Sequence, residues 1–194
     1  MINQVLPRSC RGVRYNAFTL IELIVVVSII AILSALVLST VGYARKKAAR
    51  ARAETEIAAM SAACESYKAD NGVYPREASS TDMLDARLSG NPSGYQTASL
   101  YLYKQLSGDF AANRTPTGKS YMVFKPNMLF PADQTQNVLY IQDPFSNSYG
   151  YSTIQAATQD TTKGYNPTFD LWSTVSLTSS PPTAADQNQW IKNW

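Results

Sequence analysis

Residues Phe18–Val41 read FTLIELIVVVSIIAILSALVLSTV and contain no proline, no glycine and one charged side chain, that of Glu22. At about 1.5 Å of rise per residue, a helix of this length extends about 36 Å, whereas the hydrocarbon core of a bilayer is about 30 Å thick. Because backbone groups in lipid must be hydrogen-bonded within the segment, we expect a helix despite the many valines and isoleucines. The stretch is long and apolar enough to span a membrane.

Glu22 lies about one turn inside this apolar stretch, where an ionised carboxylate is costly unless a positive charge meets it. The stretch itself has no Lys or Arg. A new amino terminus at Phe18 would supply a cation, and it exists only if residues 1–17 are removed. Glu22 is therefore a candidate functional residue and points to proteolytic processing.

The residues around this cleavage point resemble a known processing motif. Arg14-Tyr15-Asn16-Ala17 followed by Phe18-Thr19-Leu20-Ile21-Glu22-Leu23 is similar to the prepilin cleavage and methylation motif of type IV pilins and type II secretion pseudopilins. The resemblance implies cleavage by a prepilin peptidase between Ala17 and Phe18, and N-methylation of Phe18. It also implies that Glu22 meets the Phe18 amine of a neighbouring subunit during filament assembly. The family usually has glycine where this chain has Ala17.

Residues 1–17 form a short basic leader with three arginines and no acids, so the rest of the chain holds 14 basic and 14 acidic residues. The net charge of +3 belongs to the leader and does not indicate nucleic-acid binding. An alternative is a Sec signal peptide cleaved near Gly42-Tyr43-Ala44. Its apolar region would exceed the roughly 7–15 residues of such signals and would contain Glu22.

The helical pattern continues through residues 42–71 without a breaker. Apolar residues three and four apart form one stripe: Ala53, Ile57, Met60, Cys64 and Tyr67. Asn71-Gly72 supplies a left-handed stop. We expect one helix of about fifty residues, its first half in lipid and its second half packed on a globular head. Cys64 is expected to be a buried core residue, and with Cys10 in the leader no internal disulfide is expected.

The basic segment 45–52 has two interpretations. It is either a solvated helix face with local ion pairs, Arg50 with Glu54 and Arg52 with Glu56, or a surface for lipid headgroups or neighbouring subunits. The motif implies an orientation with the N-terminus in the cytoplasm. By charge alone, the five basic residues of this segment would favour the opposite orientation.

Segments in the second half of the chain extend the resemblance. Tyr67–Pro75 is similar to the helix exit of the major pseudopilin of type II secretion systems, and Asp143–Tyr151 is similar to its Asp-Pro hairpin. Phe169–Ser173 resembles its last strand, and the terminal residues 190–194 resemble its Asn-Trp ending. The implied fold is α+β and pilin-like, with a long N-terminal helix packed on a small antiparallel β-sheet head formed by residues 72–194.

Residues 76–137 are longer than the corresponding part of pseudopilins, so only local patterns apply there. We expect short helices over Thr81–Leu88 and Thr97–Ser107, the second ending at Gly108. Alternation predicts a strand over Ser120–Lys125, and Val138–Ile141 reads as another strand.

The chain shows no enzyme constellation, since it has no histidine and no Gly-rich phosphate loop. Major pseudopilins bind calcium in the loop after the last strand, but residues 174–185 contain no acid here. Calcium prefers six to eight oxygen ligands, usually with several carboxylates. Ser173 and Asp186 are the remaining weak calcium candidates, and no other cofactor is expected.

The resemblance implies a structural subunit of a type II secretion pseudopilus, which drives export of folded proteins across the outer membrane. Implied partners are further copies of the chain, a prepilin peptidase, the inner-membrane secretion platform and minor pseudopilins, with no nucleic acid. The implied location is the bacterial inner membrane, crossed once, with a cytoplasmic N-terminus and a periplasmic head.

Two alternatives stay open from sequence. One is a type IV pilin for adhesion, motility or DNA uptake, although the chain lacks the C-terminal cysteine pair that many such pilins have. The other is a membrane-anchored periplasmic enzyme or binding module, which would need no partner for Glu22. Glu22→Leu distinguishes them, because it should abolish assembly of a pilin and leave an anchor working.

Overall fold

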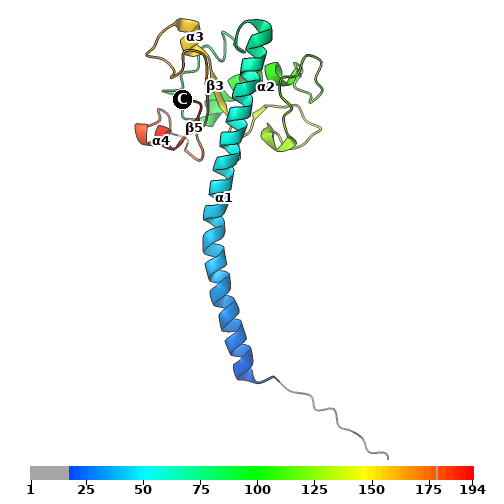
Figure 1. The fold of residues 1–194 in the computed structure, drawn as a ribbon, viewed down its shortest axis with the longest axis vertical. Helices are drawn as coiled ribbons and strands as arrows, with labels where there is room; N and C mark the ends of the chain where they lie inside the picture. The colour runs from blue at the N-terminus through cyan, green and yellow to red at the C-terminus, as the bar shows by residue number, and fades with distance from the viewer. Residues whose placement is uncertain (1–17, 178) are drawn as a thin grey trace, which may run out of the picture. The chain divides into compact units, whose positions relative to one another are not determined.

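A computed structural model describes residues 18–177 and 179–194. The leader and its expected cleavage residue Ala17 lie outside the described residues. The chain divides into two units, one ending at Ala44 and one running from Arg45 to Trp194. Helix α1, Leu20–Asn71, belongs to both units (Figure 1) and is 52 residues long. Its length confirms the single long helix predicted from sequence.

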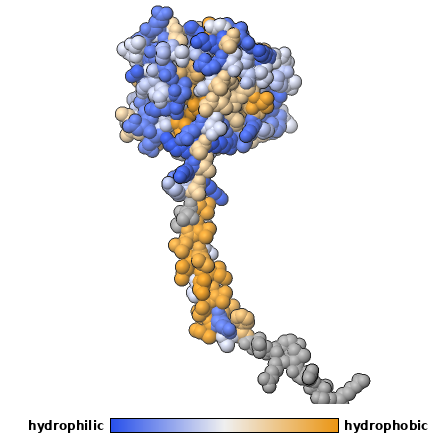
Figure 2. Space-filling model, viewed as in Figure 1, coloured by the Kyte–Doolittle hydropathy of each residue, from blue (hydrophilic) through white to orange (hydrophobic). Residues whose placement is uncertain are grey.

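The part of α1 in the first unit is apolar on all faces. Every side chain described from Phe18 to Val37 is exposed, and Figure 2 shows hydrophobic residues covering this part of the helix. Among the residues that the structure describes, α1 is the one helix long and apolar enough to cross a membrane by length and composition. A helix that is apolar all round is stable only when lipid or other helices cover it.

The second unit, called the head below, combines the last part of α1 with short helices and strands. Its elements are η1 Pro92–Tyr95, α2 Gln96–Ser107, η2 Pro126–Met128, β1 Leu129–Phe130, β2 Tyr140–Ile141, β3 Gly150–Ser152, α3 Ile154–Thr158, β4 Asp170–Ser173, α4 Ala184–Gln189 and β5 Ile191–Lys192. Strands β1 and β2 form one antiparallel sheet, and β3, β4 and β5 form another in that order. The architecture confirms the α+β fold with small antiparallel sheets.

The predicted apolar stripe of α1 is the helical side of the head core. Ala53, Ile57, Met60 and Cys64 are buried, and they cluster with buried residues of α2 and of the sheets, including Leu102, Leu106, Ile141, Tyr149, Tyr151 and Leu171. Burying each large aliphatic side chain stabilises the fold by about 1.5–3 kcal/mol. Cys64 is fully buried, so the prediction of a core cysteine is confirmed, and burial raises the pKa of its thiol.

Both predicted helix ends in the head are confirmed. Gly72 has φ +77°, and its N–H donates to the Lys68 carbonyl at 2.8 Å, which closes α1 with the left-handed turn that glycine adopts without strain. Helix α2 begins one residue before the predicted start at Thr97, and Gly108 ends it in the same left-handed conformation.

The prediction of a helix over Thr81–Leu88 was wrong, because this segment consists of turns. Its polar side chains bind nearby backbone groups instead: the Asp85 carboxylate accepts from the N–H of Arg87 at 2.9 Å, and the Thr81 hydroxyl accepts from the N–H of Glu77 at 2.8 Å. Asp and Thr compete with helical hydrogen bonds in this way.

The strand predicted over Ser120–Lys125 was also wrong, and the strand predicted over Val138–Ile141 is shorter, covering β2 alone. The N–H groups of Tyr121 and Met122 both donate to the Leu106 carbonyl, at 2.8 and 3.0 Å. The segment therefore completes the C-terminal end of α2, where carbonyls lack helical partners, and does not pair with a strand.

Candidate functional site

The start of α1 holds Glu22 in a reciprocal capping arrangement with Thr19. The backbone N–H and the hydroxyl of Thr19 donate to Oε2 of Glu22 at 3.1 and 2.8 Å, and the Glu22 N–H donates to the Thr19 hydroxyl at 3.3 Å. Such a capping box satisfies backbone donors that have no partner within the helix. Oε1 takes part in none of these three bonds. Sequence reasoning found Glu22 but missed Thr19, although Thr-x-x-Glu before an apolar run is the signal for this cap.

The surroundings of Glu22 are exposed and apolar. Phe18 is 77% exposed, and Leu20, Ile21 and Leu23 are also exposed. Phe18 lies two residues before the start of α1, and Glu22 lies in the first turn, where Thr19 holds its carboxylate. Residues 18–44 contain no Lys or Arg, so no side chain of this stretch supplies a cation for the carboxylate.

The basic segment of α1 divides into two groups. Arg45, Lys46 and Lys47 are exposed, whereas Arg50 and Arg52 are bound within the head. The Arg50 guanidinium donates to the Gln189 carbonyl at 2.9 Å and lies 3.6 Å from the Glu54 carboxylate. The predicted pairs with Glu54 and Glu56 both form. The local ion-pair interpretation holds for these two arginines.

Glu56 is a buried carboxylate with two donors. It accepts from Nε of Arg52 at 2.6 Å through Oε1 and from the hydroxyl of Tyr149 at 2.7 Å through Oε2, and Arg52 also donates to the Asn127 carbonyl at 3.3 Å. A buried charge is stable only when it is paired in this manner. The network joins α1 to the segment that leads into β3, and sequence reasoning assigned Glu56 only its helical neighbour.

Comparison with known proteins identifies the family. Residues 13–38 match the model of the prokaryotic N-terminal methylation motif, and residues 40–128 match that of type II secretion system protein G. The type II secretion system core protein G of Pseudomonas aeruginosa is 34% identical over 118 residues, which cover 61% of this chain and 79% of that protein. The chain belongs to the type II secretion system protein G family.

Further relatives agree with this assignment. The core protein G of Aeromonas hydrophila is 29% identical over 120 residues, covering 62% of this chain and 80% of that protein. No solved structure matches the chain significantly. The chain is thus a major pseudopilin, a structural subunit of a pseudopilus, from a family that is not known for enzymes. These matches favour neither a type IV pilin nor an anchored periplasmic enzyme.

The pseudopilin's two calcium candidates lie in separate hydrogen-bond networks. Ser173 is buried at the end of β4, where its hydroxyl donates to Oδ2 of Asp143 and accepts from the Val175 N–H at 3.1 Å. Asp186 is the acid of a capping box at the start of α4, and its Oδ2 accepts from the hydroxyls of Thr183 and Ser179 at 2.7 and 2.8 Å. Within the described residues, no group of three or more His, Cys, Asp or Glu side chains is placed to hold a metal ion.

Asp143 is a buried acid that sequence reasoning assigned only to a turn. Its Oδ1 accepts from the N–H groups of Phe145 and Asn147 at 2.9 and 2.8 Å, and its Oδ2 accepts from the Ser173 hydroxyl. Burial raises its pKa to about 6, although these three donors oppose the rise. The Asp-Pro dipeptide indicated the turn, but the contact with Ser173 is visible only in the fold.

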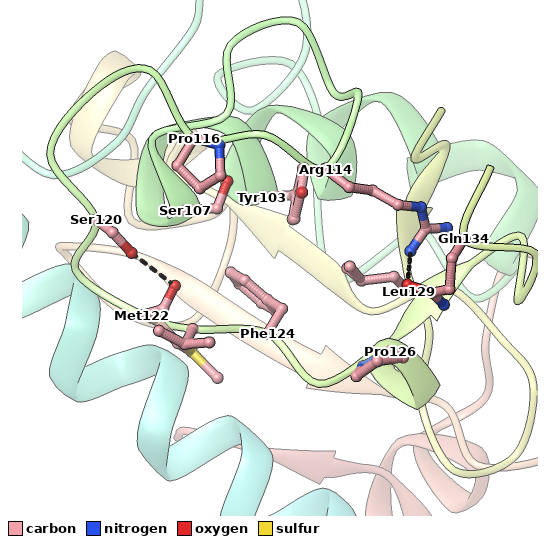
Figure 3. Close-up of a pocket in the computed structure, with 11 residues that line it drawn as sticks. Tyr103, Ser107, Arg114, Pro116, Ser120, Met122, Phe124, Pro126, Leu129 and Gln134 are labelled. Carbon is pink, nitrogen blue, oxygen red and sulfur yellow. Dashed lines mark hydrogen bonds between the residues drawn. The ribbon is translucent and has the colours of Figure 1, made fainter. Parts of the chain in front are cut away.

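The middle segment of the pseudopilin contains a hollow of about 270 Å³ (Figure 3). It is lined by Tyr103, Ser107, Arg114, Pro116, Ser120, Met122, Val123, Phe124, Pro126, Leu129 and Gln134. Its two titratable groups have structural roles: the Tyr103 hydroxyl donates to Asp109 at 2.9 Å, and the Arg114 guanidinium donates to Gln134 at 3.2 Å and to the Gln136 carbonyl at 2.9 Å. The lining therefore holds the segment together and presents no acid–base pair.

Proposed function

We propose that this pseudopilin is made as a precursor with a leader, residues 1–17, which a prepilin peptidase removes between Ala17 and Phe18. The new amine of Phe18 is then N-methylated. The match of residues 13–38 to the N-terminal methylation motif supports this processing. The small side chain of Ala17 in place of the usual glycine suits a tight peptidase site.

In the proposed topology, residues 18–41 cross the bacterial inner membrane once, with the N-terminus in the cytoplasm. Residues 42–71 continue the helix beyond the membrane, and residues 72–194 form the rest of the head, which lies in the periplasm. The apolar surface of α1 and the methylation motif support inner-membrane anchoring. The proposed orientation is the one that the processing motif implies.

The proposed assembly step pairs Glu22 of one subunit with the Phe18 amine of a neighbour. In the single chain, the Thr19 bonds engage Oε2 and leave Oε1 for a second partner. An amine that meets Oε1 neutralises the carboxylate as the helix leaves lipid and packs against other copies of α1. Because the charge pair forms at one position along the helix, it fixes the axial register of the filament.

The assembled filament acts in type II secretion, where repeated subunit addition pushes folded proteins through an outer-membrane pore. Its proposed partners are further copies of the chain, minor pseudopilins, and the inner-membrane secretion platform, with a separate ATPase supplying the work. Nucleic acid is not among them, since the mature chain has no net basic charge. The observation that carries this proposal is an exposed apolar helix with one carboxylate in a member of the protein G family.

Two experiments test the proposal. Intact-mass analysis of the protein from membranes is expected to give a chain that begins at methylated Phe18, and a start at Met1 or Arg45 would contradict the processing. Deletion of the gene is expected to leave folded exoproteins in the periplasm and to leave pilus-dependent motility unchanged. Loss of motility with normal secretion would instead assign the chain to a type IV pilus.

A further inference from the structure

The loop between β4 and α4 is the part of the head in which the family's calcium site is expected. In this chain the loop, residues 174–183, contains no acidic residue. Hydrogen bonds nevertheless join its described stretches, residues 174–177 and 179–183, to two distant parts of the head. If these bonds hold the loop in place, the loop needs no cation.

The beginning of the loop is held by Asp143. The Ser173 hydroxyl lies between two groups, donating to Oδ2 of Asp143 and accepting from the N–H of Val175. Asp143 in turn shapes its own turn by accepting from the N–H groups of Phe145 and Asn147. Both Asp143 and Ser173 are buried, so water does not compete for these bonds.

A second bond connects the same turn and loop. The side-chain amide of Asn147 donates to the carbonyl of Val175, and Val175 has φ +61°, a conformation that is unfavourable for a β-branched residue. Both backbone polar groups of Val175 are therefore bonded to side chains that Asp143 positions. A strained residue stays in such a conformation only where its surroundings hold it.

The far end of the loop is attached to the segment before η1. The Ser180 hydroxyl donates to the Leu88 carbonyl at 3.4 Å. Gly90 lies so close that a Cβ there would be 1.8 Å from the Ser179 carbonyl oxygen. Asp186 draws this end toward α4 through its bonds with Ser179 and Thr183. Asp143 therefore holds the beginning of the loop, and Asp186 holds its end.

The side-chain oxygens do not fit a calcium site. Calcium needs six to eight oxygen ligands, usually with several carboxylates converging on one point. Here Ser173 and Asp186, the two candidates, are bonded to different partners, and Asp143 already accepts three hydrogen bonds. The Ser173 hydroxyl already donates to Asp143 and accepts from the Val175 N–H, so it has one lone pair left for a further partner.

We propose that Asp143 is a clasp that holds the β4–α4 loop against the turn 143–147, so that this pseudopilin head folds without a bound divalent cation. The hydrogen bonds of Asp143 hold the loop in place, as a bound cation would do by coordinating several of its oxygens. The inference concerns the folding of the head and is independent of leader processing and filament assembly.

The test is thermal unfolding of the full chain in nonionic detergent, with tryptophan fluorescence as the signal of unfolding. All three tryptophans, Trp172, Trp190 and Trp194, lie in the head, so the signal reports this unit. The wild-type midpoint is expected to be the same in EDTA and in millimolar CaCl₂. Asp143→Ala is expected to lower the midpoint by about 5–10 °C in both buffers, since it leaves three donors without an acceptor, one of them the buried Ser173 hydroxyl.

Two control variants sharpen this test. Asp143→Asn keeps an acceptor for the backbone donors and is expected to stay within about 4 °C of wild type. Asp160→Ala removes an exposed carboxylate bonded to Thr162 in its own loop and is expected to change the midpoint little. A wild-type midpoint that CaCl₂ raises, with the rise lost in Asp186→Ala, would overturn the proposal, as would equal midpoints for Asp143→Ala and Asp160→Ala.

Hydrogen exchange gives a local readout that general destabilisation does not imitate. In Ser173→Ala, the amides of Val175 and Leu177 are expected to exchange faster, while those of α2 exchange as in wild type. Unchanged exchange at Val175 would show that the clasp does not hold the loop.

Discussion

The hydroxyl of Tyr149 donates a 2.7 Å hydrogen bond to the carboxylate of Glu56, which lies 93 positions earlier in the chain. Arg52 binds the other oxygen of the same carboxylate at 2.6 Å. A buried acid is thereby paired on both sides, and the second part of α1 is fixed to the chain that enters β3. Breaking one side of such a buried network costs more than the net value of one bond.

Tyr149→Phe is expected to lower the free energy of unfolding of the head by about 1–3 kcal/mol, because it leaves Oε2 of buried Glu56 without its donor. Denaturant unfolding followed by tryptophan fluorescence measures this change. Tyr140→Phe is the matched control, since its ring is stacked on Phe130 and, among the described residues, its hydroxyl is in no hydrogen bond. Equal effects of the two variants would show that the Glu56 bond contributes nothing specific.

Asp143 gives the head a distinct pH dependence. Burial raises the pKa of this carboxyl from 3.8 to about 6, and the nearby Glu56 charge adds to the rise. Because the folded state then holds its proton more tightly than the unfolded state, this group's contribution to the free energy of unfolding increases as pH falls from about 6 to about 4. Above pH 6 the ionised carboxylate reduces stability.

Asp143→Asn removes this titration. The difference in unfolding free energy between wild type and Asp143→Asn is therefore expected to shift in favour of wild type by up to about 3 kcal/mol between pH 7 and pH 4. Measuring the difference cancels the acid titrations that both proteins share. A difference independent of pH would show that Asp143 has an ordinary pKa.

The end of α1 depends on the conformation of Gly72, not on the space around it. Nothing lies within 4 Å of a Cβ built at Gly72, but its φ is +77°. Gly72→Ala is expected to destabilise the head by about 1–2 kcal/mol through backbone strain alone. Gly94→Ala, which also has open space and an ordinary φ, is expected to be neutral or stabilising. Equal unfolding midpoints for both variants would contradict this account of the helix end.

The elements that sequence predicted well are those determined by local chemistry. The apolar run and its stripe gave α1, and the glycines that end α1 and α2 have the left-handed conformation that was expected. The turn at Asp143 was likewise visible, because the Asp-Pro dipeptide specifies it locally. The strand at Asp170–Ser173 was expected from the resemblance of Phe169–Ser173 to the family's last strand, although β5 follows it in this chain.

The failures occur where distant parts of the chain decide the structure. Ser120–Lys125 alternates like a strand, yet the carbonyl of Leu106 binds its backbone and no strand lies beside it. The Tyr149 partner of Glu56 lies 93 positions away and the Ser173 partner of Asp143 lies 30 positions away, so neither contact can be predicted from periodicity or motif spacing. The capping role of Thr19 could have been predicted from the sequence, since its partner Glu22 lies three residues later.

The central claim is that the Glu22 carboxylate assembles the filament by pairing with an amine of another copy. Glu22→Gln keeps an oxygen that can accept the Thr19 bonds and removes the charge, whereas Thr19→Ala keeps the charge and removes the hydroxyl of the cap. The two variants therefore separate pairing from capping.

The most direct measurement is the amount of assembled pseudopilus recovered from cells that produce equal amounts of each processed variant. The account predicts that Glu22→Gln loses filaments by at least about tenfold, as Glu22→Leu should, while Thr19→Ala assembles close to the wild-type level. Normal filament yield in Glu22→Gln, or loss of filaments in Thr19→Ala alone, would contradict the claim and leave Glu22 as a helix cap.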